Sequence, residues 1–120
     1  MYGPTVVEHF SRPRNVGRIE DADGVGRVDD RVTDNLVTIY VKLDGRRIEA
    51  ARFRTLGCSA CVAASSVATE LVAGRSLDEA LAIDASAILT ALGGLPSDKQ
   101  HCAELAARAL QLALEMATRR

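Results

Sequence analysis

The chain lacks features that mark several common classes of protein. It has no Trp and only two Phe and two Tyr among its 120 residues, so its core must be built from aliphatic side chains. No apolar run approaches the roughly 20 residues that a membrane-spanning helix needs. Met1 to Pro4 do not begin a basic segment followed by a continuous apolar stretch, as a signal peptide would. We therefore expect a cytoplasmic protein with no membrane partner.

An excess of charge of either sign is also missing. The chain has 15 basic and 16 acidic residues, for a net charge of -1. Nucleic acids select basic surfaces, so this balance predicts that nucleic acid is not a partner. The sequence contains no phosphate-binding loop, no Ser–His–Asp constellation and no H-E-x-x-H helix. We therefore expect that the protein is not an enzyme.

The patterns that are present predict one small α+β domain covering residues 1–120. An apolar–polar alternation and an Asp44-Gly45 turn predict two strands of a hairpin. In total, three strands are expected, one each over residues 24–30, 36–43 and 47–55. Helices are expected over residues 5–10, 59–73, 76–82, 85–92 and 99–118, with capping boxes at Thr5/Glu8 and Ser76/Glu79. The predicted fold is an N-terminal helix and a three-stranded antiparallel sheet with helices packed on one face.

Only three cysteines are present, and all lie where helices are expected to begin. Cys58 and Cys61 form a C-x-x-C pair after the last strand, and Cys102 follows His101 at the start of the last helix. Unpaired N–H groups and the positive end of the helix dipole favour the thiolate form at such positions. In a reducing compartment, such thiols are more often metal ligands or redox-active groups than disulfides.

Together, Cys58, Cys61, His101 and Cys102 supply three sulfurs and one nitrogen. This donor set suits a tetrahedral Zn²⁺ ion or an iron–sulfur cluster. Thiol redox chemistry by the Cys58–Cys61 pair is another alternative. Cysteine also packs as a small apolar residue, so Cys61 and Cys102 could simply fill the core. The residue pattern leaves these alternatives open, and it suggests that the other histidine, His9, is a partly exposed helix residue.

Several separated motifs resemble the IscU/NifU family of iron–sulfur cluster assembly scaffolds, nearly from end to end. In chain order they are residues 7–10, 13–17, 51–58, 64–70, 74–80 and 99–102. The resemblance implies the α+β fold predicted above and a site at one end of it. There, a cluster, expected to be [2Fe–2S], would be built from iron, electrons and sulfur from a cysteine desulfurase. It would then pass to apo recipient proteins.

The resemblance is incomplete at the site itself. Where the family has Cys-Gly-Asp before its second strand, this chain has Thr33-Asp34-Asn35, so Thr33 replaces a cysteine and Asn35 an aspartate. The positions that keep the family's ligands are Cys58, His101 and Cys102. By this correspondence, Cys102 is the implied acceptor of sulfur from the desulfurase.

Two side chains offer replacement ligands. Cys61 adds a thiol that the family pattern does not require, about one helical turn from Cys58, and Asp34 adds a carboxylate. The sequence does not decide whether Cys61 points toward His101 or into the interface between helix and sheet. We predict a scaffold or carrier that binds iron or a cluster through Cys58, Cys61, His101 and Cys102. A zinc-binding homologue that builds no cluster is the alternative.

The family's chaperone-recognition motif is only partly kept. Leu-Pro-Pro-Val-Lys is here Leu95-Pro96-Ser97-Asp98-Lys99. This difference weakens the expectation of hand-off through an Hsp70-type chaperone.

Overall fold

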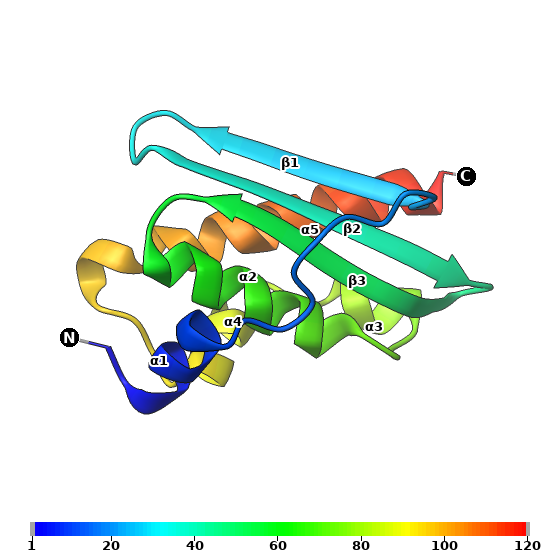
Figure 1. Ribbon diagram of the computed structural model, residues 1–120. Coiled ribbons are helices and arrows are strands. Elements are labelled where there is room, and N and C mark those ends of the chain that lie inside the picture. The colour runs from blue at the N-terminus through cyan, green and yellow to red at the C-terminus, as the bar shows by residue number, and fades with distance from the viewer. Residues whose placement is uncertain (1, 120) are drawn as a thin grey trace.

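A computed structural model describes residues 2–119 and confirms the predicted fold class (Figure 1). The antiparallel sheet has the strand order β1-β2-β3, formed by Gly24–Asp30, Asn35–Asp44 and Arg47–Leu56. The helices are α1 (Pro4–Ser11), α2 (Ser59–Val72), α3 (Leu77–Leu81), α4 (Ala85–Leu92), the 3₁₀ turn η1 (Ser97–Lys99) and α5 (His101–Thr118). Within residues 2–119, no helix is both long and apolar enough to cross a bilayer.

The core lies between the sheet and the helices, and it is aliphatic as predicted. Along β2, Val37, Ile39 and Val41 are fully buried, whereas the alternate residues face outward. Of the aromatic side chains in the described part of the chain, only Phe53 is fully buried. The α2 and α5 helices cover the inner face of the sheet (Figure 1). In the segment before β1, Asn15 and Gly17 pair with the backbone of Phe53 along the free edge of β3. The segment also crosses in front of the sheet in the view of Figure 1.

The α5 helix lies unusually close to β1 because the strand presents glycine to it. A Cβ atom at Gly24 would collide with the carbonyl of Ala113, and one at Gly26 with the carbonyl of Ala109. Because glycine has no side chain, the helix backbone at Ala109 and Ala113 rests almost directly on the strand. This contact determines how α5 is seated, and therefore where its first turn lies.

The α1 helix is held against α2 by His9, which is only 5% exposed, so the prediction of a partly exposed His9 is wrong. Its Nδ1 lies 2.7 Å from the Ser66 hydroxyl, and its Nε2 lies 3.5 Å from the Glu70 carboxylate. The backbone N–H of Arg14 also donates to the Ser66 hydroxyl. The burial arises from the docking of two helices distant in sequence, which the pattern within α1 cannot reveal.

Most helix boundaries follow the predicted signals. The Ser76/Glu79 capping box is present at α3. The predicted cap at Thr5 is wrong, because α1 begins after Gly3 with Pro4 in its first turn, a position where the missing N–H of proline costs nothing. The last helix begins at His101, two residues later than predicted, because residues 97–99 form a 3₁₀ turn.

The Gly26→Ala substitution tests the seating of α5. The added methyl group must displace the helix backbone at Ala109, so we expect a loss of about 1–3 kcal/mol in the free energy of unfolding, as for other overpacked sites. Urea denaturation measures this loss. Gly3→Ala is the control, because a Cβ there meets nothing within 4 Å. Equal stability of wild type and Gly26→Ala would show that α5 is not held in this way.

The buried His9 should make stability depend on pH. Burial lowers the pKa of His9 below the ordinary histidine value of 6.5, although the Glu70 carboxylate opposes this. The unfolded chain therefore binds a proton more readily than the folded chain. His9 therefore stabilises the fold fully at a pH above the pKa that it has in the unfolded chain. This stabilisation is lost as the pH falls from that value toward the lower pKa that His9 has in the folded chain.

Thermal unfolding of wild type and His9→Gln between neutral and mildly acidic pH measures this contribution. We expect the midpoint of the wild type to fall more steeply with decreasing pH than that of the variant, because glutamine does not titrate. Parallel pH profiles would contradict the assignment.

Candidate metal centre

The first turns of α2 and α5 meet at one end of the sheet, beside the β1–β2 hairpin (Figure 1). Cys58 is the residue that precedes α2, directly after β3 and Gly57, and Cys61 lies in the first turn of α2. Cys102 lies in the first turn of α5. The structure thus brings together three of the four residues predicted for the site, and the fourth, His101, is adjacent to Cys102.

The three sulfur atoms form a compact group. All three lie within 4.8 Å of one another, and the sulfurs of Cys58 and Cys102 are 3.4 Å apart. None of the three cysteines is in a disulfide. Ligands of a tetrahedral ion with metal–sulfur bonds of about 2.3 Å lie about 3.8 Å apart. Small side-chain shifts would therefore let one metal contact all three.

The thiols differ in exposure. Cys61 and Cys102 are both 0% exposed, whereas Cys58 is partly exposed. Cys61 and Cys102 thus belong to the core, as one alternative predicted, and at the same time face the neighbouring sulfurs. Cys58 is the thiol through which the group meets solvent.

A hydrogen bond from the Cys61 thiol lowers the pKa of Cys102 to about 6, and a hydrogen bond from Cys58 and the charge of His101 act in the same direction. The same hydrogen bond to Cys102, together with burial, raises the pKa of Cys61. Of these two buried thiols, Cys102 is therefore the more readily ionised.

His101 lies at the rim of the sulfur group. Its Nε2 is 3.6 Å from the sulfur of Cys102, and the residue is partly buried. In the neighbouring hairpin, a hydrogen bond from Thr33 lowers the pKa of the Asp30 carboxyl, and the charge of His101 contributes to that shift. The imidazole therefore adjoins Cys102 but lies outside the compact group of three sulfurs.

The hairpin residues that replace the family's cysteine and aspartate are engaged in other contacts. The Thr33 hydroxyl donates to Asp30 at 2.7 Å and accepts from the Asn35 amide at 3.0 Å. Asn35 is 3% exposed, and its carbonyl oxygen accepts the backbone N–H of Cys58 at 3.0 Å. A Cβ at Gly57 would strike this oxygen. Thr33 and Asn35 therefore brace the hairpin against the start of α2, a role that sequence reasoning missed.

Asp34, the other predicted replacement ligand, is exposed and has a positive φ of 59°. It lines a shallow depression with Asp29, Leu36 and Gly57 rather than joining the sulfur group.

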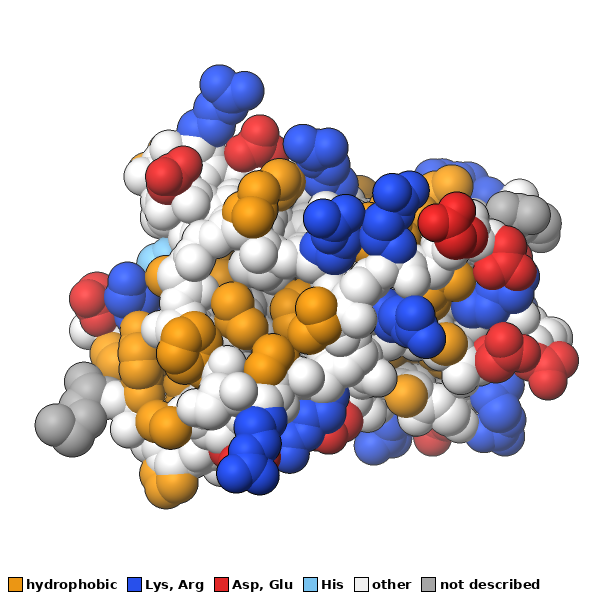
Figure 2. All heavy atoms as spheres, viewed as in Figure 1, with side chains coloured by type: hydrophobic (Ala, Val, Ile, Leu, Met, Phe, Trp, Pro, Cys, Tyr) orange, Lys and Arg blue, Asp and Glu red, His pale blue; other side chains and the backbone are white. Residues whose placement is uncertain are grey.

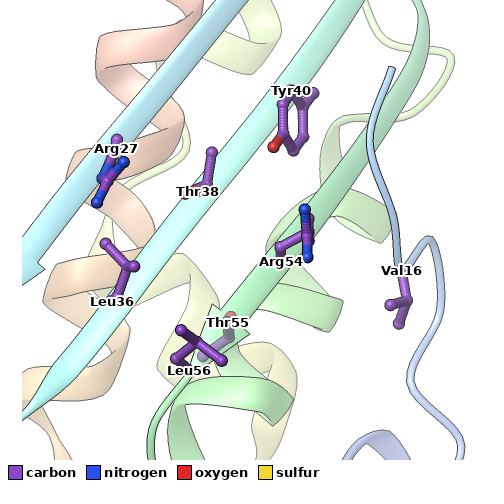
Figure 3. A pocket seen from close by; sticks show the side chains of 8 residues that line it. All are labelled: Val16, Arg27, Leu36, Thr38, Tyr40, Arg54, Thr55 and Leu56. Carbon is purple, nitrogen blue, oxygen red and sulfur yellow. The ribbon is translucent and has the colours of Figure 1, made fainter. Parts of the chain in front are cut away.

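The outer face of the sheet carries a separate depression of about 380 Å³, on the side away from the buried core (Figure 3). Arg27 and Arg54 lie on either side of Thr38, because these residues are paired across the three strands. No cysteine, histidine or acidic residue lines it. It is therefore not a second metal site.

Exposed hydrophobic side chains gather on the side of the molecule where α1 and the start of α2 lie (Figure 2). Large exposed hydrophobic residues include Leu56, which is 71% exposed two residues before Cys58, and Val16, Phe10 and Val7. Val16 and Leu56 both line the depression on the sheet. Lys and Arg side chains occupy much of the rest of this view (Figure 2). Exposed apolar clusters of this kind often mark contact surfaces for other proteins.

Curated relatives match the chain over most of its length. The iron-sulfur cluster assembly scaffold protein IscU 1 of Archaeoglobus fulgidus is 53% identical over 114 residues, which cover 95% of this chain and 74% of that protein. The IscU scaffold protein of Haemophilus influenzae is 39% identical over 117 residues, which cover 94% of this chain and 92% of that protein.

A solved structure supports the fold. The N-terminal part of a nitrogen-fixing NifU-like protein from Brucella abortus superposes with a TM-score of 0.80, covering 98% of this chain and 94% of that one. Its sequence identity is 18%, so this likeness shows the fold alone. The family model described as the NifU-like N terminal domain matches residues 1–120. With the identities above, this match shows that the chain belongs to the NifU-like N-terminal domain family, which includes the IscU scaffolds.

Proposed function

We propose that this protein is a scaffold on which an iron–sulfur cluster is assembled and from which it is passed on. The observation that carries the proposal is the meeting of the Cys58 and Cys102 sulfurs, 3.4 Å apart, at the starts of two different helices. Cysteine thiolates are the usual ligands of iron–sulfur clusters, and histidine can replace one of them. The names of the IscU relatives of Archaeoglobus and Haemophilus support the same role.

In this proposal, iron and sulfur are cargo, and the protein holds them without turning over a substrate of its own. Cys58, His101 and Cys102 bind the cargo, and a [2Fe–2S] cluster is the expected form. The three free thiols fit a reducing compartment, which supports a cytoplasmic location.

A cysteine desulfurase is the proposed sulfur donor, with Cys102 as acceptor. The Cys102 thiolate would attack the outer sulfur of the donor's persulfide. A sulfur–sulfur bond forms on Cys102, the bond in the donor breaks, and the donor leaves as a thiolate. Since Cys102 is 0% exposed, this step requires a local opening at the site, and Cys58 is the thiol that an approaching donor meets first.

We propose that the donor and the apo recipient proteins dock at the thiol end. Leu56 is 71% exposed, and Val32, in the hairpin, is 94% exposed. An exposed apolar surface beside the thiols would bring a partner's sulfur or ligands close to the cargo. We propose no chaperone hand-off at residues 95–99, where Leu95 is 8% exposed and so unavailable to a partner.

Zinc binding without cluster assembly is the second candidate function. The specific observation in its favour is the spacing of the sulfurs, which suits one tetrahedral ion. A permanent zinc ion would occupy the ligands that cluster assembly requires.

Anaerobic reconstitution with iron and sulfide tests the scaffold. We expect the wild type to take up both and to develop the visible absorbance of a cluster. Cys58→Ser and Cys102→Ser should each lose most of it, because a hydroxyl is a poor ligand for these irons. Iron and sulfide assays and absorbance after desalting give the readout.

Ser59→Ala is the control, since it alters the residue next to Cys58 without removing sulfur. A wild-type protein that retains tightly bound zinc and takes up no cluster after the zinc is removed would contradict the scaffold and favour the second candidate.

A further inference from the structure

The resemblance described above implies a cysteine at the hairpin position where this chain has Thr33. The chain has a further cysteine on α2, Cys61, three residues after Cys58. Residues three apart lie on the same side of a helix. The structure places the Cys61 sulfur within 4.8 Å of both other sulfurs.

We propose that Cys61 is the replacement ligand: the metal is held by three sulfurs from the starts of α2 and α5, with none from the hairpin. The inference rests on the proposed metal-binding role of this site. It identifies which atoms bind the cargo in this chain.

The direction of the Cys61 side chain is the first support. A cysteine that only fills space between helix and sheet has no reason to turn its sulfur toward other sulfurs. Cys61 is 0% exposed, yet its sulfur lies within 4.8 Å of those of Cys58 and Cys102. Its neighbours Ala60, Ala63 and Ala64 show that alanine fills this part of α2. Burial alone therefore does not account for a thiol at this position.

The state of the hairpin is the second support. The Thr33 hydroxyl is occupied by Asp30 and Asn35, and the Asn35 carbonyl is occupied by the N–H of Cys58. Neutral hydroxyl and amide oxygens are also poor partners for the soft, thiolate-preferring metals. The hairpin thus holds the start of α2 in position, and the two helices supply the metal ligands.

In this proposal, Cys61 binds the metal as a thiolate. A coordinating thiol gives up its proton to solvent as the metal–sulfur bond forms. The resulting donor set is three thiolates and, after rotation of its ring, His101. Because both helix starts belong to the packed core, the sulfurs are close together before the metal arrives.

The absorbance of bound cobalt(II) reports how many thiolates coordinate the metal. Its sulfur-to-metal charge-transfer absorbance rises with each thiolate bound, and it occupies tetrahedral Cys/His sites in place of zinc. We expect Cys61→Ala to lower the absorbance per bound cobalt by about one third, from three thiolates to two. Zinc affinity, measured by competition with a chromophoric chelator, should fall at least about tenfold.

Two further variants make the result specific. Val62→Ala removes a partly buried side chain in the same helical turn without touching sulfur, and it should leave the cobalt spectrum unchanged. Thr33→Cys combined with Cys61→Ala returns a sulfur to the hairpin, and it should restore the absorbance toward that of three thiolates. Cys61→Ser serves if the alanine variant does not fold.

An unchanged cobalt spectrum in Cys61→Ala, or a two-thiolate spectrum in the wild type, would overturn the inference. These results would refute the role of Cys61 as a ligand without refuting the proposed scaffold function. A wild type that forms a cluster, together with a Cys61→Ala protein that forms the same cluster, refutes only the role of Cys61. A three-thiolate cobalt spectrum in a wild type that never takes up a cluster refutes the scaffold and leaves the role of Cys61 standing.

Discussion

The site depends on how α5 is seated on the sheet. Gly24 and Gly26 let the backbone of α5 approach β1 at Ala113 and Ala109, closer than any side chain would permit. The α2 helix packs on the same inner face directly after β3. Both helices consequently begin at the same end of the sheet, and cysteines 44 residues apart in sequence come into contact. This packing brings together three thiols that no single segment of the chain contains.

Much of this arrangement could be predicted from the sequence. The period-two alternation in residues 36–43 and the Asp44-Gly45 turn are local signals, and the structure has β2 and β3 where they indicated. The spacing of Cys58, His101 and Cys102 within separated motifs indicated a shared site, and the sulfurs of Cys58 and Cys102 do meet. Local patterns were sufficient here because each element carries its own boundary signals.

The remaining features arise from contacts between elements. His9 is buried because α1 docks on α2, and no pattern within α1 reports that. The direction of the Cys61 sulfur depends on where α5 begins relative to α2. Asn35 holds the N–H of Cys58 because the hairpin folds over the start of α2, which the substitution of an aspartate by asparagine does not by itself reveal. In each case, the missing information is a distance between residues far apart in the chain.

The hairpin substitutions and the extra thiol have a common physical interpretation. Thr33 and Asn35 are neutral side chains that hydrogen-bond to each other, and Asn35 also accepts the backbone N–H of Cys58 at the start of α2. Cys61 places a thiol on the helix that these bonds hold in position.

X-ray absorption at the iron edge of the cluster-loaded, anaerobic protein tests the central claim most directly. The account predicts iron coordinated mainly by sulfur, with a short iron–iron distance, and iron coordinated only by oxygen and nitrogen would contradict it.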